Sequence, residues 1–180
     1  MKLKYGDAAP TFEAEDANGH IWQIPDDFKN KPFILVFLRH LGCPLCMRRL
    51  DELKAEYSRF KGMGAELMVI TQSTQERVRK YSAKKSIPYP LIGDKEKKIY
   101  SLFGVRSGGL GALLAPRVLK ESAKATLKGY FHGPLEGDEL LVPAEFIIGG
   151  DGKIAWAHYG SDISDSSPNE IILKELRALK

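Results

Sequence analysis

A continuous apolar run, residues 33–38 (FILVFL), is the strongest pattern in the chain. It is as short as a strand and follows a proline, which is typical of a strand buried on both faces. Residues 66–71 and 89–92 repeat the pattern more weakly and predict two further strands. The polar, helix-forming segments 74–85 and 95–103 follow these strands in turn. Strands that alternate with helices predict an α/β protein with parallel strands.

Helical periodicity begins directly after the first strand. A helix is expected to start at Cys43, with a proline near its first position, and to end at Gly62 and Gly64. The apolar positions that would share its inward face are Cys46, Leu50, Leu53, Tyr57 and Phe60. A second amphipathic helix is expected over 168–180.

Two pairs of short segments predict β-hairpins. Asn18-Gly19, the strongest short hairpin signal, separates residues 11–16 from residues 20–24. A glycine-rich turn separates residues 144–148 from residues 153–158 in the same way. The expected sheet is therefore extended by hairpins at both ends of the chain.

Residues 106–141 fit this pattern least well. One helical segment, 110–127, is interrupted by Pro116 and followed by a glycine-rich tail. Its apolar residues are Leu110, Leu113, Leu114, Val118 and Leu119. They could cover a site as a lid, form a dimer contact, or pack on the core. We therefore expect one domain, 1–180, with a helical insert at about 106–141.

Charge and length exclude several classes of protein. Lys and Arg number 27 against 23 Asp and Glu, and no basic arm indicates nucleic acid. No apolar run reaches the roughly 18 residues of a membrane span, so no membrane partner is expected. The N-terminus has no apolar segment of a secretory signal, which favours a cytoplasmic protein.

The two cysteines of the chain, Cys43 and Cys46, lie in the sequence GCPLC. At a helix start, the partial positive charge of the free backbone N–H groups stabilises a thiolate at Cys43. A spacing of two residues also allows a disulfide. A CxxC between a buried strand and a helix predicts a thioredoxin-like redox pair that needs no cofactor. Arg39 and His40 lie close enough to add positive potential.

Other interpretations of these residues stay open. The cysteine pair could be a zinc or copper half-site, although the histidines lack ligand-like spacing, or two incidental buried thiols. Arg39 could stabilise a thiolate or a bound peroxide, or only end a strand. His40 could act as a base or lie on the surface. Arg48 and Arg49 are expected on a solvated helix face.

Three stretches carry a resemblance to a known family: FILVFLRHLGCPLCMRRLDEL, YPLIGDKEKKIYSLFGV and GDELLVPAEFIIGGDGKIAWAHYG. In this order they resemble the alkyl hydroperoxide reductase / thiol-specific antioxidant superfamily, in its peroxiredoxin-like branch with a CxxC. The resemblance covers most of residues 8–160. It implies a thioredoxin-like fold, with a central mixed sheet, flanking helices and an N-terminal β-hairpin addition.

The resemblance transfers unevenly to single residues. Aligned on the Pro-x-x-x-Thr-x-x-Cys signature of peroxiredoxins, Cys46 takes the place of the peroxidatic cysteine, Cys43 that of the Thr and Arg39 that of the Pro. Pro143 stands where peroxiredoxins have a late Arg. Thioredoxin-like reductases have a cis-proline there, so a cis bond before Pro143 is expected. We nevertheless favour Cys43 as the nucleophile, because a thiol at a helix start should be the more exposed.

The expected function is the reduction of hydroperoxides by the Cys43–Cys46 pair, reset by a thioredoxin- or glutathione-type reductant. The first alternative is a protein-disulfide reductase. Two alternatives from other classes are a copper or zinc binding module and a redox-regulated interaction protein. A homodimer is compatible with each of these functions.

Overall fold

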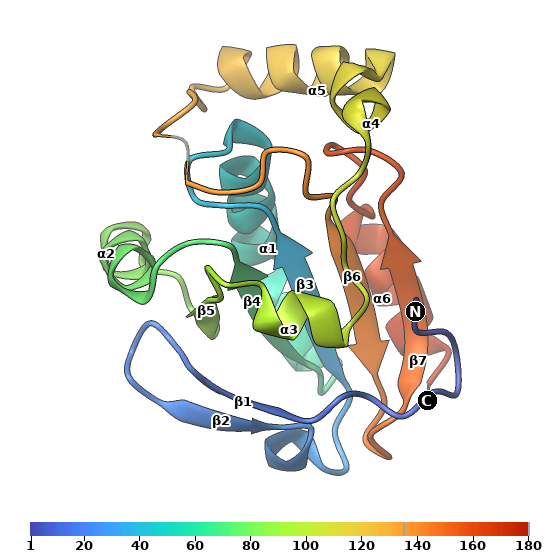
Figure 1. Ribbon diagram of the computed structural model, residues 1–180. Helices are drawn as coiled ribbons and strands as arrows, with labels where there is room; N and C mark the ends of the chain where they lie inside the picture. The colour runs from blue at the N-terminus through green and yellow to red at the C-terminus, as the bar shows by residue number, and fades with distance from the viewer. Residues whose placement is uncertain (135, 180) are drawn as a thin grey trace.

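The computed structural model describes residues 1–134 and 136–179. Its centre is a five-stranded sheet with the order β5-β4-β3-β6-β7 (Figure 1). The strands are β3 (Phe33–Leu38), β4 (Glu66–Thr71), β5 (Leu91–Gly93), β6 (Ala144–Ile148) and β7 (Ile154–Tyr159). Strands β3, β4 and β5 are parallel, whereas β6 and β7 are antiparallel to their neighbours. The predicted mixed sheet is confirmed.

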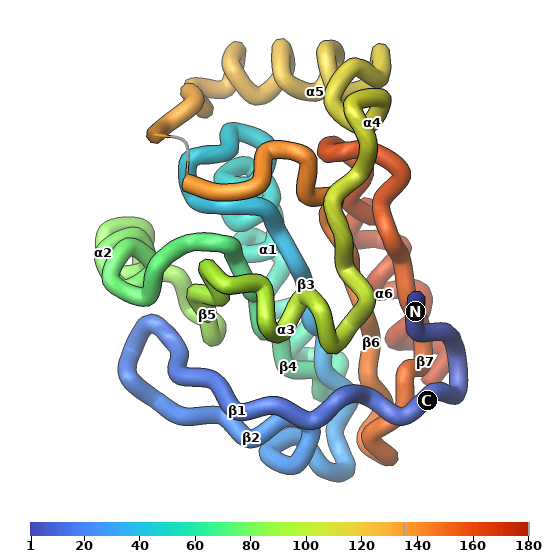
Figure 2. The backbone as a smooth tube through the Cα atoms, in the orientation of Figure 1, coloured from blue at the N-terminus to red at the C-terminus, as the bar shows by residue number. Residues whose placement is uncertain are grey.

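Helices cover both faces of the sheet, and a separate hairpin of β1 (Phe12–Glu15) and β2 (Ile21–Ile24) lies below it (Figure 2). A short 3-10 turn, η1 (Asp26–Phe28), follows the hairpin. The helices are α1 (Pro44–Gly62), α2 (Gln75–Lys85), α3 (Lys98–Leu102), α4 (Leu110–Leu114), α5 (Pro116–Leu127) and α6 (Asn169–Arg177). Sequence periodicity located each of them to within a few residues.

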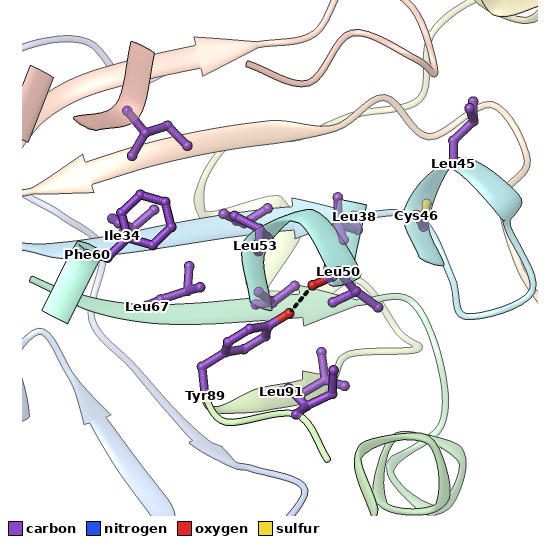
Figure 3. Close-up of a cluster of buried hydrophobic side chains, with 14 of the residues drawn as sticks. Ile34, Leu38, Leu45, Cys46, Leu50, Leu53, Phe60, Leu67, Tyr89 and Leu91 are labelled. Carbon is purple, nitrogen blue, oxygen red and sulfur yellow. Dashed lines mark hydrogen bonds between the residues drawn. The ribbon is translucent and has the colours of Figure 1, made fainter. Parts of the chain in front are cut away.

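Strand β3 separates two hydrophobic cores, because its side chains alternate between the faces of the sheet. Ile34 and Val36 point into the core under α1 and α6, and Leu35 and Phe37 into the core under α3. Figure 3 shows the first core. All six residues of β3 are buried, as the continuous apolar run predicts.

The insert forms two helices that lie across the carboxyl end of β3 (Figure 1). Pro116 begins α5, which explains the break in the helical pattern. Only Val118 and Ala125 of α5 enter the core beside α1. The leucines of α4 and α5 face solvent instead, so the apolar stripe of these helices is not simply a core face.

A buried ion pair joins α1 to the sheet. Arg49 is 3 % exposed and Glu145, on β6, is fully buried. Arg49 donates to Glu145 Oε1 from Nη2 at 2.9 Å and from Nε at 3.2 Å. Glu145 Oε2 also accepts the backbone N–H of Ser167 at 2.7 Å. The prediction that Arg48 and Arg49 form a solvated face is therefore wrong, since Arg49 has an acidic partner inside the sheet and Arg48 is paired with Glu121.

Replacing one member of this pair is expected to destabilise the fold strongly. Glu145→Leu leaves the Arg49 guanidinium buried without its carboxylate, which costs about 3–5 kcal/mol of unfolding free energy. The double variant Arg49→Met/Glu145→Leu should recover most of that loss, because no buried charge remains. Denaturant unfolding of the two variants and the parent measures both effects. A double variant no more stable than the single one would contradict this account.

Candidate active site

The two cysteines lie where β3 ends and α1 begins. Cys43 is the N-cap residue of α1, and Pro44 occupies the first helical position, where its missing N–H has no consequence. The Cys43 sulfur accepts the backbone N–H of Cys46 at 3.3 Å. The side chain that caps the helix is therefore a sulfur, and the helix N-terminus directs partial positive charge at it.

Arg39 supplies the full positive charge of the site. Arg39 is 4 % exposed, and its Nη2 donates to the Cys43 sulfur at 2.8 Å. Nη1 donates to the backbone carbonyl of Glu139 at 2.6 Å and to its Oε2 at 3.1 Å. Arg39 thus links the sulfur to a carboxylate that lies 100 residues further along the chain.

These contacts shift the pKa values of the two thiols in opposite directions. Burial alone would raise the pKa of Cys43, but the Cys46 thiol, the Arg39 charge and the Cys46 N–H lower it to about 6. Burial and the neighbouring Cys43 sulfur raise the pKa of Cys46 well above its ordinary value. At neutral pH the pair therefore holds one thiolate, on Cys43, and one thiol, on Cys46.

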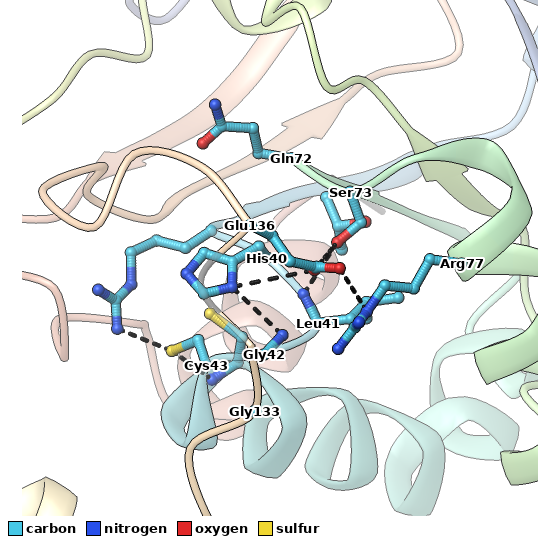
Figure 4. A network of polar contacts seen from close by, with 12 residues as sticks. His40, Leu41, Gly42, Cys43, Gln72, Ser73, Arg77, Gly133 and Glu136 are labelled. Carbon is cyan, nitrogen blue, oxygen red and sulfur yellow. Dashed lines mark hydrogen bonds and ion pairs between the residues drawn. The ribbon is translucent and has the colours of Figure 1, made fainter.

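The expectation that Cys43 is the more exposed thiol is wrong. Cys43 is 0 % exposed and Cys46 4 % exposed. The tail of the insert covers the loop before Cys43, where Gly133 N–H donates to Gly42 O at 2.9 Å (Figure 4). A Cβ on Gly42 would lie 2.3 Å from Pro134 O, so only glycine allows this close approach.

We define the cover segment as residues 131–134 and 136–141. Its acidic side chains hold it against the end of the sheet. Glu136 accepts the Ser73 hydroxyl at 2.7 Å and pairs with Arg77 (Figure 4). Asp138 pairs with Lys97 at 2.9 Å. Glu139 pairs with Arg39 at 3.1 Å. Sequence reasoning missed these three residues, because charges in a glycine-rich tail give no periodic signal.

His40 is fully buried and faces the cover segment. Its Nδ1 accepts the backbone N–H of Gly42 at 3.2 Å, so the ring proton lies on Nε2, which is 2.8 Å from Glu139 Oε1. Burial lowers the pKa of His40, which favours this neutral tautomer. Nδ1 is hydrogen-bonded to Gly42 and Nε2 lies next to Glu139, whereas Arg39 is the side chain that donates to the sulfur of Cys43.

A cavity of about 410 Å³ opens beside Cys46. Arg39, Cys46 and Pro143 lie in its wall, together with Arg48 and Arg117. The expectation of a cis bond before Pro143 is wrong. Ile24–Pro25 is the one cis peptide bond in the described chain. Pro143 directly precedes β6, and its carbonyl accepts the N–H of Gly160 at 2.9 Å. Three of the predicted site residues, Arg39, Cys46 and Pro143, nevertheless line this one cavity.

Two absences concern the described residues alone. Within 1–134 and 136–179, no group of three or more His, Cys, Asp or Glu side chains has the arrangement of a metal site. Over the same residues, every helix is too short or too polar to cross a bilayer.

Comparisons with known proteins agree with the resemblance in the sequence. The family model described as "AhpC/TSA family" matches residues 5–157. The chloroplastic peroxiredoxin Q of Sedum lineare is 28 % identical over 112 residues, 62 % of this chain and 60 % of the relative. Peroxiredoxin-like 2C of Bos taurus is 24 % identical over 88 % of this chain and 74 % of its own length. The chain spans about half to three fifths of the plastid relatives it matches.

Solved structures share the fold at low identity. Peroxidoxin BcpB from Mycobacterium tuberculosis superimposes with a TM-score of 0.73 and 18 % identity, over 99 % of both chains. The thioredoxin-like fold implied by the sequence is thereby confirmed. With a family model that covers most of the sequence, the chain belongs to the AhpC/TSA family.

Proposed function

We propose that this chain is a thiol peroxidase that reduces hydroperoxides with the Cys43–Cys46 pair. The observation that carries the proposal is the contact of 2.8 Å between the Arg39 guanidinium and the Cys43 sulfur. Together with the Cys46 thiol and the Cys46 backbone N–H, this contact lowers the pKa of Cys43 to about 6 and maintains a thiolate at neutral pH. A thiolate is the form of cysteine that attacks a peroxide. Membership of the AhpC/TSA family, and relatives named peroxiredoxin, support the same reaction.

In the first step, the Cys43 thiolate attacks one oxygen of the hydroperoxide. The S–O bond forms, the O–O bond breaks, and the alkoxide leaves with a proton taken from water. The cavity beside Cys46 offers the peroxide a route to Arg39, which lies in the cavity wall and contacts the buried Cys43 sulfur. The guanidinium can therefore donate to the oxygen on which negative charge develops. This role would replace the late Arg of peroxiredoxins, whose position is occupied by Pro143.

In the second step, the Cys46 thiol attacks the sulfenic acid on Cys43. A disulfide forms, and the hydroxyl leaves as water with the proton of the Cys46 thiol. One external dithiol, or two monothiols, then reduces the disulfide and takes the oxidising equivalents away. A thioredoxin- or glutathione-type reductant supplies these thiols, and the cytoplasm, where such reductants are abundant, suits the cycle.

A thiolate titration tests the assignment of Cys43. In reduced Cys46→Ser protein, the ultraviolet absorbance of the thiolate should appear with a midpoint at a pH of about 6, since serine preserves a hydrogen-bond donor to the sulfur. Adding Arg39→Gln should raise that midpoint by about one to three pH units, because a neighbouring opposite charge is lost. The rate of peroxide reduction should decline below pH 6 in the parent, as Cys43 becomes protonated. Thiolate formation near pH 6 in Cys43→Ser instead would reverse the assignment.

Rapid mixing with hydrogen peroxide tests the reaction itself. The parent should lose both thiols per peroxide consumed and form the intramolecular disulfide. Cys43→Ser should react at least about a thousandfold more slowly, since the nucleophile is gone. Cys46→Ser should react once and stop at the sulfenic acid.

A thiol–disulfide reductase would behave differently in the same proteins. It would reduce insulin disulfides rapidly and consume peroxide no faster than a free thiol. Arg48→Gln is a matched control for Arg39→Gln, because Arg48 lines the same cavity but pairs with Glu121 rather than with a sulfur. The control should retain the thiolate titration of the parent.

A further inference from the structure

The insert exposes an unusual share of the large hydrophobic side chains. Twelve such side chains are exposed among the described residues, and six of them lie between residues 110 and 131. Leu110 and Leu114 on α4 are 71 % and 73 % exposed, and Leu119 and Leu127 on α5 are 70 % and 87 % exposed. Their spacings of four and eight residues give each helix one apolar outer side. We call these four leucines the leucine stripe.

The same segment carries the net charge of the protein. Residues 106–134 contain five Lys and Arg side chains and one acidic side chain, a net charge of +4. The whole chain also has a net charge of +4, so the rest of it is neutral. Lys120 and Lys124 on α5 and Lys128, the residue that caps its C-terminus, are exposed and form a second stripe beside the leucines. The acidic residue, Glu121, pairs with Arg48 at 2.9 Å and with Lys124 at 2.7 Å, so Lys120 and Lys128 are the lysines of the stripe without an acidic partner among the described residues.

A surface that combines an apolar stripe with a lysine stripe fits a partner that has both negative charge and an apolar layer. The lysines would contact the negative charge, and the leucines would contact the apolar layer. A second copy of the chain would bring like charges together, which disfavours the homodimer contact. Protein interfaces are depleted in Lys, and their strongest contact residues are seldom Leu. Leucine beside lysine on an amphipathic helix is instead the composition of helices that lie in the surface of a bilayer.

We propose that α4 and α5 bind the surface of an anionic lipid bilayer, with the leucine stripe inserted among the acyl chains and the three lysines among the headgroups. The helices lie on the bilayer and do not cross it, which replaces the expectation of no membrane contact. Arg117 and Glu121 of α5 also line the cavity beside Cys46, so the bound protein would hold that cavity close to the lipid. The proposal is independent of the peroxidase reaction.

Vesicle flotation with the full reduced chain tests this proposal. The protein should float with vesicles of phosphatidylcholine and phosphatidylserine, and much less with vesicles of phosphatidylcholine alone. Raising the salt concentration from about 0.1 M to about 1 M should release it, because screening shortens the Debye length to about 3 Å. The triple variant Lys120→Gln/Lys124→Gln/Lys128→Gln should bind about a hundredfold more weakly. Leu119→Ser/Leu127→Ser should bind at least about a hundredfold more weakly.

The control removes the same charge from another surface. Lys80→Gln/Lys84→Gln/Lys85→Gln changes three exposed lysines of α2 and should leave vesicle binding close to that of the parent. Equal losses in the two triple variants would overturn the proposal, as would absence of parent flotation with anionic vesicles. Binding to polyglutamate without binding to vesicles would also overturn it and would assign the surface to an acidic protein. Peroxide reduction is measured separately, so either result leaves the proposed function to its own tests.

Discussion

The buried guanidinium of Arg39 is the constraint on which the site depends. A cation that is 4 % exposed requires compensating negative charge. Two groups supply this charge, the Cys43 thiolate and the Glu139 carboxylate. The first comes from the start of α1 and the second from the cover segment. Satisfying one arginine therefore joins the end of β3, the first turn of α1 and a segment a hundred residues away. The reactive form of the sulfur is at the same time a structural partner of the arginine.

The two sulfurs of the pair face different surroundings, although they are adjacent. Cys43 lies beneath the cover segment and contacts Arg39, whereas Cys46 borders the cavity. Arg39 is common to both surroundings, because it contacts the Cys43 sulfur and lines the cavity. A small substrate in the cavity would reach Cys46 and the arginine that contacts the Cys43 sulfur. A large disulfide-bonded protein would have to displace the cover segment to reach Cys43.

Much of the framework could be predicted from the sequence, since periodicity reflects burial directly. The apolar run of β3, the Asn18-Gly19 hairpin and the helix that begins after Cys43 are local patterns, and each is present. The cysteine pair and Arg39 were also identified, because they adjoin the strongest strand. The residues that surround them could not be predicted. Glu139, for example, belongs to the cover segment, and no local sequence pattern determines the path of that segment. The trans bond before Pro143 shows the same limit in a residue inferred by resemblance.

Arg49 illustrates why helix charge patterns mislead at buried positions. On α1 it belongs to a run of charged residues that resembles a solvated face. Its side chain nevertheless pairs with Glu145, which lies within the apolar strand β6. A single glutamate in the sequence AEFII was the one available signal, since an unpaired carboxylate is rarely buried. The pair also forms part of the cavity boundary through Arg49, so the same contact that ties α1 to β6 shapes the space next to Cys46.

The position of both cysteines within one turn of α1 has a consequence for damage by excess oxidant. The Cys43 sulfur already contacts the backbone of Cys46, so the second thiol can close on an oxidised first sulfur without unfolding any helix. In the proposed cycle, a sulfenic acid on Cys43 would therefore have a resolving thiol at hand before it met another peroxide molecule. This arrangement would reduce irreversible conversion to sulfinic or sulfonic acid.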